Sequence, residues 1–299
     1  MGIARFGKVL TAMVTPFHED GSLDVDGAAT LARWLVDQGN DGLVLSGTTG
    51  EAPTLGDDEA VALWRAVRAA VDVPLLAGTG SNDTRHTVEL SQRAAETGVD
   101  GLLVVSPYYN RPPQSGLDAH YRAVAAATDL PVVMYDVPSR TGRAIAVGTI
   151  VRLANEVPNI VGLKDARGNP SQAAEIIAGA PDDFDLYSGD TGLTLSLLAV
   201  GAVGVVGVCS HWTAGLHADM IAAFEKGDVL TARQINARLA PSFAVESSDT
   251  WVHTAAAKAA MAALGQPAGP CRLPLPPLGD DVHTAVRTVL DDLGLAADG

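Results

Sequence analysis

The feature that most constrains the fold of this 299-residue chain is a series of short apolar runs, each followed by a stretch long enough for a helix. The runs, rich in Val, Leu and Ile, are Val9–Thr15, Gly42–Ser46, Pro74–Thr79, Gly101–Ser106, Pro131–Val137, Ile160–Asp165, Asp185–Ser188 and Gly204–Val208. Continuous apolar strands that alternate with helices indicate a parallel sheet buried on both faces. Eight strand–helix units in roughly 220 residues predict a (β/α)₈ TIM barrel, which typically takes about 250 residues. A doubly wound sheet is the alternative, but no Gly-x-Gly-x-x-Gly follows the first run.

Local signals define the helices between these runs. Helical periodicity marks segments such as Asp26–Gln38, Asp57–Ala70 and Thr84–Glu96. The predicted N-caps are Asn82 or Asp83 for one helix and Ser171 for another, and the predicted helix stops are Gly39 and Gly98. Each of these two glycines opens a Gly-x-Asp-Gly turn that leads into the next strand.

The C-terminal part of the chain follows a different pattern. From about Thr231 it is helical, with an alanine-rich segment His253–Leu264 and a further helix Asp280–Leu293. The Pro-rich segment Gly265–Pro277 between them predicts a rigid connector. We therefore expect a catalytic barrel over residues 1–230 and a small helical domain over residues 231–299.

Charge and composition exclude several classes of partner. The net charge of −15 and the pI of about 4.7 oppose phosphate backbones and anionic membranes, so we expect no nucleic-acid partner. No apolar run is long enough to span a bilayer, and Cys209 and Cys271 are too few for a disulfide framework. The expected location is the cytoplasm. The seven histidines form no metal-ligand pair, so the sequence predicts no metal and no cofactor.

Lys164 is the leading candidate for a catalytic residue. It closes the apolar run Ile160–Asp165, whereas Lys8, Lys226 and Lys258 lie in ordinary polar or helical contexts. Burial lowers the pKa of an amine, and a neutral amine is a nucleophile that forms an imine with a ketone or aldehyde. The alternative is a structural lysine whose ammonium reaches a carboxylate or solvent.

The residues that follow the other strands support the catalytic interpretation, because chemistry in a (β/α)₈ barrel takes place at the carboxyl ends of the strands. Groups at these ends are Thr48, Thr49, Glu51, Tyr108, Tyr109, Tyr135, Arg140, Lys164, Gly189 and Val206. Hydroxyls, an arginine and a lysine are thus expected to converge on one rim.

Each of these groups has a chemical task and a simpler alternative. Thr48 and Thr49, flanked by glycines, can offer N–H and hydroxyl groups to a carboxylate, or simply form a turn. Tyr135 can shuttle protons beside the amine, or pack as a barrel aromatic. Arg140 can bind a second carboxylate with its fixed fork, or remain a surface charge. Glu51 is expected to anchor its loop.

These residues resemble a known family. The segments Gly47–Glu51, Tyr135–Gly142 and Val161–Asp165, together with the opening Thr11–Phe17, are similar to the dihydrodipicolinate synthase family of pyruvate-dependent class I aldolases, in the superfamily of N-acetylneuraminate lyase. The resemblance covers essentially the whole chain. Departures are Asp136, where many members have asparagine, and Cys209-Ser210-His211 after the eighth strand.

The resemblance implies a complete reaction. Lys164 would form a Schiff base with pyruvate, and Thr48 and Thr49 would bind the pyruvate carboxylate. Thr49 would link Tyr135 to Tyr109 in a proton relay, with Tyr109 supplied by a neighbouring subunit. The enamine would attack L-aspartate 4-semialdehyde, giving 4-hydroxy-tetrahydrodipicolinate on the diaminopimelate route to lysine.

The same resemblance places Arg140 on the second substrate's carboxylate and the backbone of Gly189 and Val206 along the site. It also implies a homotetramer made of two dimers. Two alternatives stay open: a sister aldolase acting on N-acetylneuraminate or a keto-sugar acid, and a non-catalytic barrel that senses a keto acid. Thr48-Thr49 and Arg140 favour the synthase over the first, and the intact proton relay disfavours the second.

Overall fold

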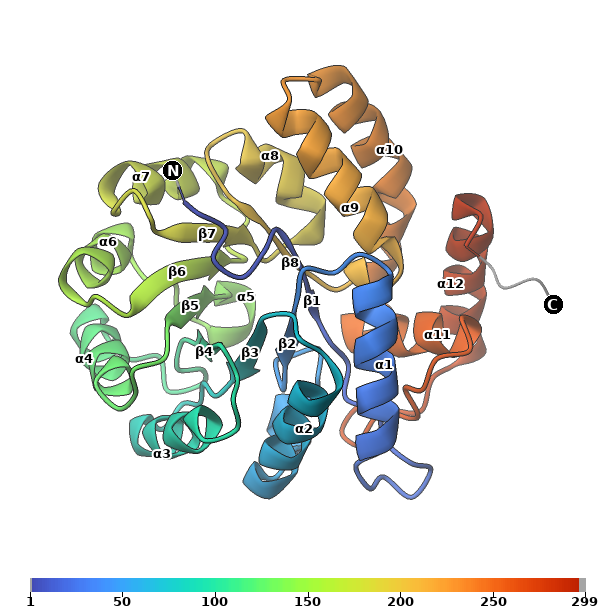
Figure 1. Ribbon diagram of the computed structural model, residues 1–299, viewed down its shortest axis with the longest axis horizontal. Coiled ribbons are helices and arrows are strands. Elements are labelled where there is room, and N and C mark those ends of the chain that lie inside the picture. Colours follow the sequence, from blue (N-terminus) through green and yellow to red (C-terminus); the bar gives the residue numbers. More distant parts are fainter. Residues whose placement is uncertain (1, 296–299) are drawn as a thin grey trace. The chain divides into compact units, whose positions relative to one another are not determined.

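The computed structural model describes residues 2–295 and contains the predicted parallel barrel (Figure 1). Its strands are β1 (Val9–Ala12), β2 (Gly42–Leu45), β3 (Leu75–Gly78), β4 (Gly101–Val105), β5 (Val132–Asp136), β6 (Ile160–Asp165), β7 (Asp185–Ser188) and β8 (Gly204–Gly207). They pair in chain order and close into a barrel, so the TIM-barrel prediction is confirmed and the doubly wound sheet is wrong. Every residue of β1, β2, β5, β7 and β8 is buried, as continuous apolar strands require.

The helices follow the predicted segments closely. They are α1 (Val25–Asp37), α2 (Asp57–Ala70), α3 (Thr84–Ala95), α4 (Gln114–Ala125), α5 (Pro138–Thr141), α6 (Val147–Glu156), α7 (Pro170–Gly179), α8 (Thr194–Leu198), α9 (Ser210–Glu225), α10 (Val229–Glu246), α11 (His253–Ala263) and α12 (Asp280–Leu293), with short 3₁₀ turns η1 (Ala52–Thr54) and η2 (Thr191–Leu193). In the described chain no helix is long and apolar enough to cross a membrane.

One predicted helix cap is confirmed and another is wrong. The Asp83 carboxylate accepts the Arg85 N–H at the start of α3, as expected of an N-cap. The predicted cap Ser171 lies inside α7 instead. The cap is Asn169, whose side chain accepts the Gln172 N–H at 3.2 Å, because Pro170 takes the first helical position.

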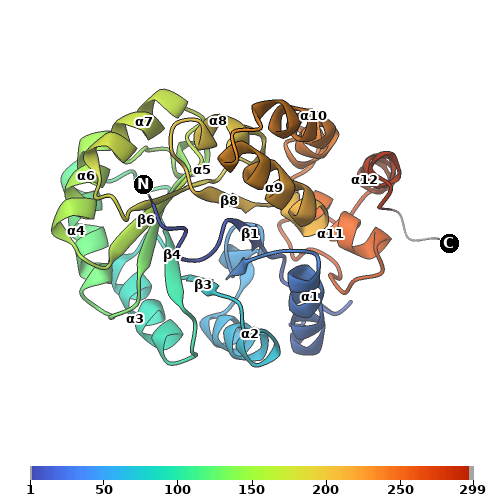
Figure 2. The ribbon, with the colours of Figure 1, turned by 45° about the horizontal axis from the view of Figure 1, so that its top comes forward.

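The chain forms two compact units. The first comprises residues 2–8 and Pro74–Val206, and the second comprises Val9–Val73 and residues 207–295. In the first unit α3 packs against α4, α4 against α6 and α6 against α7, on the outer side of β4–β6 (Figure 2). In the second unit α1 packs against α2, and α9 packs against α10. The boundary between residues 230 and 231 stays a prediction, and residues 1 and 296–299 of the two predicted domains lie outside the described residues.

The aspartate of each Gly-x-Asp-Gly turn bonds to the first residue of the strand that precedes the turn's own strand in the barrel. The Asp100 N–H donates to the Leu75 carbonyl at 2.9 Å, while the Asp100 carboxylate accepts the Leu75 N–H at 2.8 Å. Asp41 makes the same pair of bonds with Val9, at 2.8 and 3.0 Å. The glycine that opens each turn has a left-handed backbone, with φ of +84° at Gly98 and +98° at Gly39. Each aspartate therefore saturates both backbone groups at the start of the preceding strand.

Candidate active site

The pairing of β5 with β6 brings the predicted nucleophile and the predicted proton shuttle together. The Cα atoms of Tyr135 and Lys164 are register partners, and the Lys164 Nζ lies 4.5 Å from the centre of the Tyr135 ring. Both side chains are buried, at 5% exposure for Lys164 and 7% for Tyr135. An amine held over a phenol, away from bulk water, is placed for imine chemistry with proton transfer.

Gly189 leaves room for the Lys164 side chain. A Cβ at Gly189 would lie 2.9 Å from the Lys164 Cγ and 3.0 Å from the Ala166 Cβ, closer than real Cβ contacts. The Gly189 N–H donates to the Asp165 carbonyl at 2.7 Å, which continues the β6–β7 ladder beyond the strand. Val206 is a fully buried residue of β8. The backbone of Gly189 therefore lies close to the Lys164 side chain, and the roles of Gly189 and Val206 in lining the site stay predictions.

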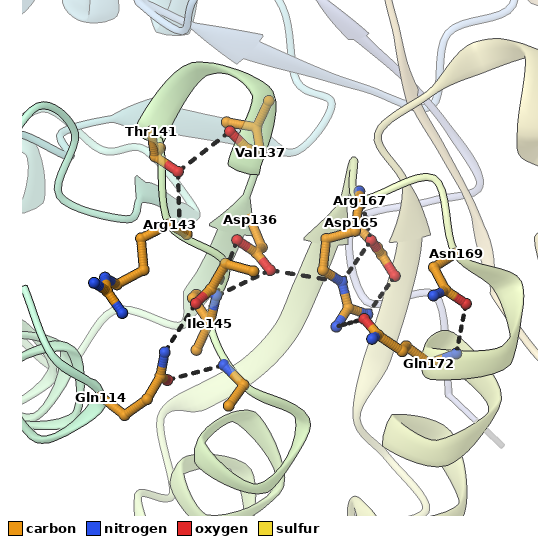
Figure 3. Close-up of polar contacts among 12 residues, drawn as sticks. Gln114, Asp136, Val137, Thr141, Arg143, Ile145, Asp165, Arg167, Asn169 and Gln172 are labelled. Atoms are coloured by element: carbon orange, nitrogen blue, oxygen red, sulfur yellow. Dashed lines mark hydrogen bonds and ion pairs between the residues drawn. The ribbon is translucent and has the colours of Figure 1, made fainter. Parts of the chain in front are cut away.

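Arg140 lies on the exposed turn that follows β5. It belongs to the short helix α5, which ends at Gly142 with a left-handed φ of +74°. The Thr141 hydroxyl donates to the Arg143 carbonyl at 3.0 Å and fixes this turn from within (Figure 3). An exposed guanidinium on a fixed turn can reach an incoming anionic substrate.

Tyr109 is an exposed side chain in the folded chain. Its side chain is 90% exposed, and its backbone has a left-handed φ of +71°, which is uncommon for a residue with a Cβ. The next residue, Asn110, donates its side-chain amide to the Asn82 carbonyl at 2.8 Å. A tyrosine this exposed is not packed against the buried Tyr135 of its own chain.

The loop with Thr48 and Thr49 lies in the second compact unit and follows β2. Thr49 is buried at 2% exposure and Thr48 is half-buried. The Thr15 hydroxyl donates to the Gly50 carbonyl at 2.6 Å, and a Cβ at Gly50 would lie 3.0 Å from the Met13 carbonyl. Glycine suits this position because the loop passes close to the segment that directly follows β1.

Glu51 anchors this loop through a buried ion pair, which confirms one prediction and corrects another. The Glu51 carboxylate lies 2.7 Å from the Lys258 Nζ and accepts the Arg272 N–H at 2.8 Å. The prediction that Lys258 lies in an ordinary context is wrong: its side chain is fully buried, and burial lowers its pKa although Glu51 opposes that change. The alanine-rich pattern of α11 gave no sign of a buried cation.

A second buried ion cluster joins Asp136 and Asp165, the residues that directly follow Tyr135 and Lys164 (Figure 3). Arg167 binds Asp165 at 2.7 Å and lies 3.5 Å from Asp136. Burial, with a smaller contribution from Asp165, raises the pKa of Asp136 to about 7, although the Ile145 N–H and Arg167 oppose this shift. The only sign of this cluster in the sequence is an acidic residue directly after both Tyr135 and Lys164, which did not predict the role of Arg167.

The buried histidines are poor candidates for catalysis. Burial lowers the pKa of His120, His211 and His217 to about 4, so their imidazoles are neutral at physiological pH. His211 accepts the Val14 N–H at 3.1 Å, a structural role. Among residues 2–295 there is no group of three or more His, Cys, Asp or Glu side chains arranged to hold a metal ion.

Comparisons with known proteins agree over nearly the whole chain. The dihydrodipicolinate synthetase family matches residues 5–293. A 4-hydroxy-tetrahydrodipicolinate synthase of Acidothermus cellulolyticus is 52% identical over 295 residues, covering 98% of this chain and 93% of that relative. The crystal structure of the Cyanidioschyzon merolae enzyme with lysine bound is 42% identical, with a TM-score of 0.94 and coverage of 97% and 99%. A structure described as the first monomeric dihydrodipicolinate synthase variant is 34% identical, with a TM-score of 0.92 and coverage of 96% and 97%.

Proposed function

Since this chain belongs to the dihydrodipicolinate synthetase family, we propose that it condenses pyruvate with L-aspartate 4-semialdehyde to give 4-hydroxy-tetrahydrodipicolinate. The product is the first heterocycle on the diaminopimelate route to lysine. The observation that carries the proposal is the buried Lys164 Nζ, 4.5 Å from the centre of the Tyr135 ring. The named relatives give no support to a sister aldolase.

The first half of the reaction activates pyruvate on Lys164. The neutral amine attacks the keto carbon, and loss of water gives the imine. Tyr135 is the proposed proton carrier, since its phenol lies beside the amine and is shielded from bulk water. Loss of a proton from the pyruvate methyl group then gives the enamine. Thr48 and Thr49 are the proposed ligands of the pyruvate carboxylate, and the close backbone of Gly189 and Val206 is proposed to line the site.

The second half forms the new carbon–carbon bond and releases the enzyme. The enamine carbon attacks the aldehyde of the second substrate, whose carboxylate is proposed to bind Arg140. The substrate amine then attacks the imine carbon and expels Lys164, which closes the ring. The exposure of Arg140 on a turn fixed by Thr141 supports this assignment, because the second substrate enters after pyruvate is bound.

We further propose that the chain acts in the cytoplasm as a tetramer of two dimers, with Tyr109 completing the relay through Thr49 in a neighbouring subunit. The exposure and left-handed backbone of Tyr109 support this role. An aromatic side chain held 90% exposed by a strained backbone is suited to enter a partner.

Reductive trapping tests the proposal. Incubation with pyruvate and borohydride should add one pyruvate-derived group at Lys164, identified by peptide mass spectrometry. Lys164→Ala should remain folded and unlabelled, whereas the control Lys226→Ala, at an exposed position, should be labelled like the wild type. Labelling of another lysine, or none, would contradict the imine mechanism, and steady turnover with N-acetylneuraminate would overturn the substrate assignment.

A further inference from the structure

The carboxyl ends of β5 and β6 carry a second pair of residues behind the reactive pair. Asp136 directly follows Tyr135, Asp165 directly follows Lys164, and the two aspartates are register partners like the residues before them. Because successive side chains of a strand point to opposite faces, the aspartates lie on the other side of the sheet from the amine and the phenol. Both are buried, with side-chain exposures of 0% for Asp136 and 2% for Asp165.

Arg167 joins the two strand ends. Its Nη2 lies 2.7 Å from Asp165 Oδ2, its Nε donates to Asp165 Oδ1 at 3.0 Å, and its backbone N–H donates to the same oxygen at 2.9 Å. The Nε also lies 3.5 Å from Asp136 Oδ2 on β5. The Arg167 side chain is only 3% exposed, so one buried guanidinium spans both carboxylates (Figure 3). A planar fork can hold two carboxylates in a fixed geometry, which an ammonium cannot do.

The same cluster also anchors the turn that carries Arg140. Both Asp136 oxygens accept the Ile145 N–H at 3.2 Å. The Gln114 side chain holds the residues on either side of Ile145, donating to the Ala144 carbonyl and accepting the Ala146 N–H, each at 2.9 Å. The chain that returns from Arg140 is therefore tied to the residue that follows Tyr135.

Two buried carboxylates with one buried guanidinium are a poor way to gain stability, since desolvation of such a cluster offsets its attraction. The cluster instead fixes the positions of the two strand ends and of the backbone groups bonded to them. The Ala166 N–H donates to the Asp136 carbonyl at 2.9 Å, and the Asp165 carbonyl accepts the Gly189 N–H at 2.7 Å. A shift of Asp165 would move Gly189, whose backbone leaves no room for a Cβ beside the Lys164 side chain.

We propose that Arg167 is a positioning residue: by clamping Asp136 and Asp165 it holds the Tyr135 phenol and the Lys164 amine in the geometry that imine formation needs. This inference rests on the proposed function, since it concerns the same amine. Misplacement of a reacting group by about 1 Å slows a step by up to about a hundredfold.

The test compares imine formation in Arg167 variants. The single variant Arg167→Met leaves two buried carboxylates without their cation, which destabilises the fold. The double variant Arg167→Met/Asp165→Asn removes the clamp and one of the two carboxylates, so that only Asp136 is left without its cation. Arg152→Met is the matched control, because Arg152 is a surface arginine that also binds an aspartate, Asp118, at 2.9 Å. Each protein is mixed with saturating pyruvate, quenched with borohydride after increasing times, and the modified fraction is measured by mass spectrometry.

We expect the double variant to form the imine about tenfold to a hundredfold more slowly than the wild type, at temperatures where circular dichroism shows both to be folded. The control should match the wild type. If the double variant does not fold, Arg167→Lys replaces it: this variant keeps the charge, loses the fork, and should show the same slow step. A wild-type rate in either folded variant overturns the inference alone. A wild-type protein that forms no pyruvate adduct overturns the proposed function and this inference with it.

Discussion

The buried pair Glu51–Lys258 offers a sharp test of how the C-terminal helices support the loop with Thr48 and Thr49. The substitution Lys258→Met keeps most of the side-chain volume and removes the ammonium. It takes away the partner 2.7 Å from the Glu51 carboxylate and the donor that bonds the Pro270 carbonyl at 2.7 Å. The remaining carboxylate is buried, with the Arg272 N–H still bonded to it at 2.8 Å.

The expected loss of stability follows from that environment. Removing one partner of a buried ion pair costs about 3–5 kcal/mol, because the other charge is left uncompensated. With an unfolding entropy of about 2.1 cal/mol/K per residue, a chain of 299 residues should show a fall in Tm of about 5–8 °C. The double variant Lys258→Met/Glu51→Gln removes the stranded charge and should recover about half of that loss.

Thermal unfolding at one fixed protein concentration measures this effect, with Lys226→Met as the control at an exposed lysine. Activity gives an independent measurement. Since the Glu51 N–H donates to the Thr48 carbonyl at 3.1 Å, a released Glu51 should raise the KM for pyruvate more than it lowers kcat. A Lys258→Met protein as stable as the control, with an unchanged KM, would refute the idea that the pair holds the loop.

Three further predictions concern the first compact unit. Arg140→Ala should lower kcat/KM for aspartate semialdehyde about a hundredfold, the effect of about 2–3 kcal/mol from a charged hydrogen bond, with little change in pyruvate binding; equal losses for both substrates would make Arg140 structural. Mixed Tyr109→Phe and Lys164→Ala subunits should regain one competent site per hybrid dimer, and no recovery in confirmed hybrids would place Tyr109 in its own chain's site. Because burial raises the pKa of Asp136 from 3.8 to about 7, the native carboxyl ionises only near neutral pH and the wild type should lose stability as pH rises from 4 to 7, by on the order of 4 kcal/mol. Asp136→Asn should remove this pH dependence of stability. Denaturant unfolding at pH 5 and pH 8 measures it, and parallel losses of stability in the wild type and the variant would contradict the prediction.

Local chemistry made the barrel and the position of the proposed nucleophile predictable. Apolar runs such as Ile160–Asp165 cannot leave their continuous hydrophobic faces in water, so their number and spacing determine a closed parallel sheet. The position of Lys164 at the end of such a run follows from the neighbouring residues along the chain. That Tyr135 lies at the same level of β5 depends on how the two strands pair, and this pairing includes a register shift between Val132 and Val133.

Charges that are buried by distant segments could not be predicted in the same way. Lys258 lies in an alanine-rich helix and Glu51 in a loop after β2, and nothing local to either residue shows that packing removes both from water. Arg167 is likewise an arginine in a polar turn until folding sets it against Asp165 and Asp136. Periodicity along a chain records which side chains avoid water, but the partners of a buried charge depend on which segments meet. The sequence by itself therefore determined the barrel and the position of the proposed nucleophile, and only the tertiary structure decided which buried ion pairs form, Glu51 with Lys258 and Arg167 with Asp165.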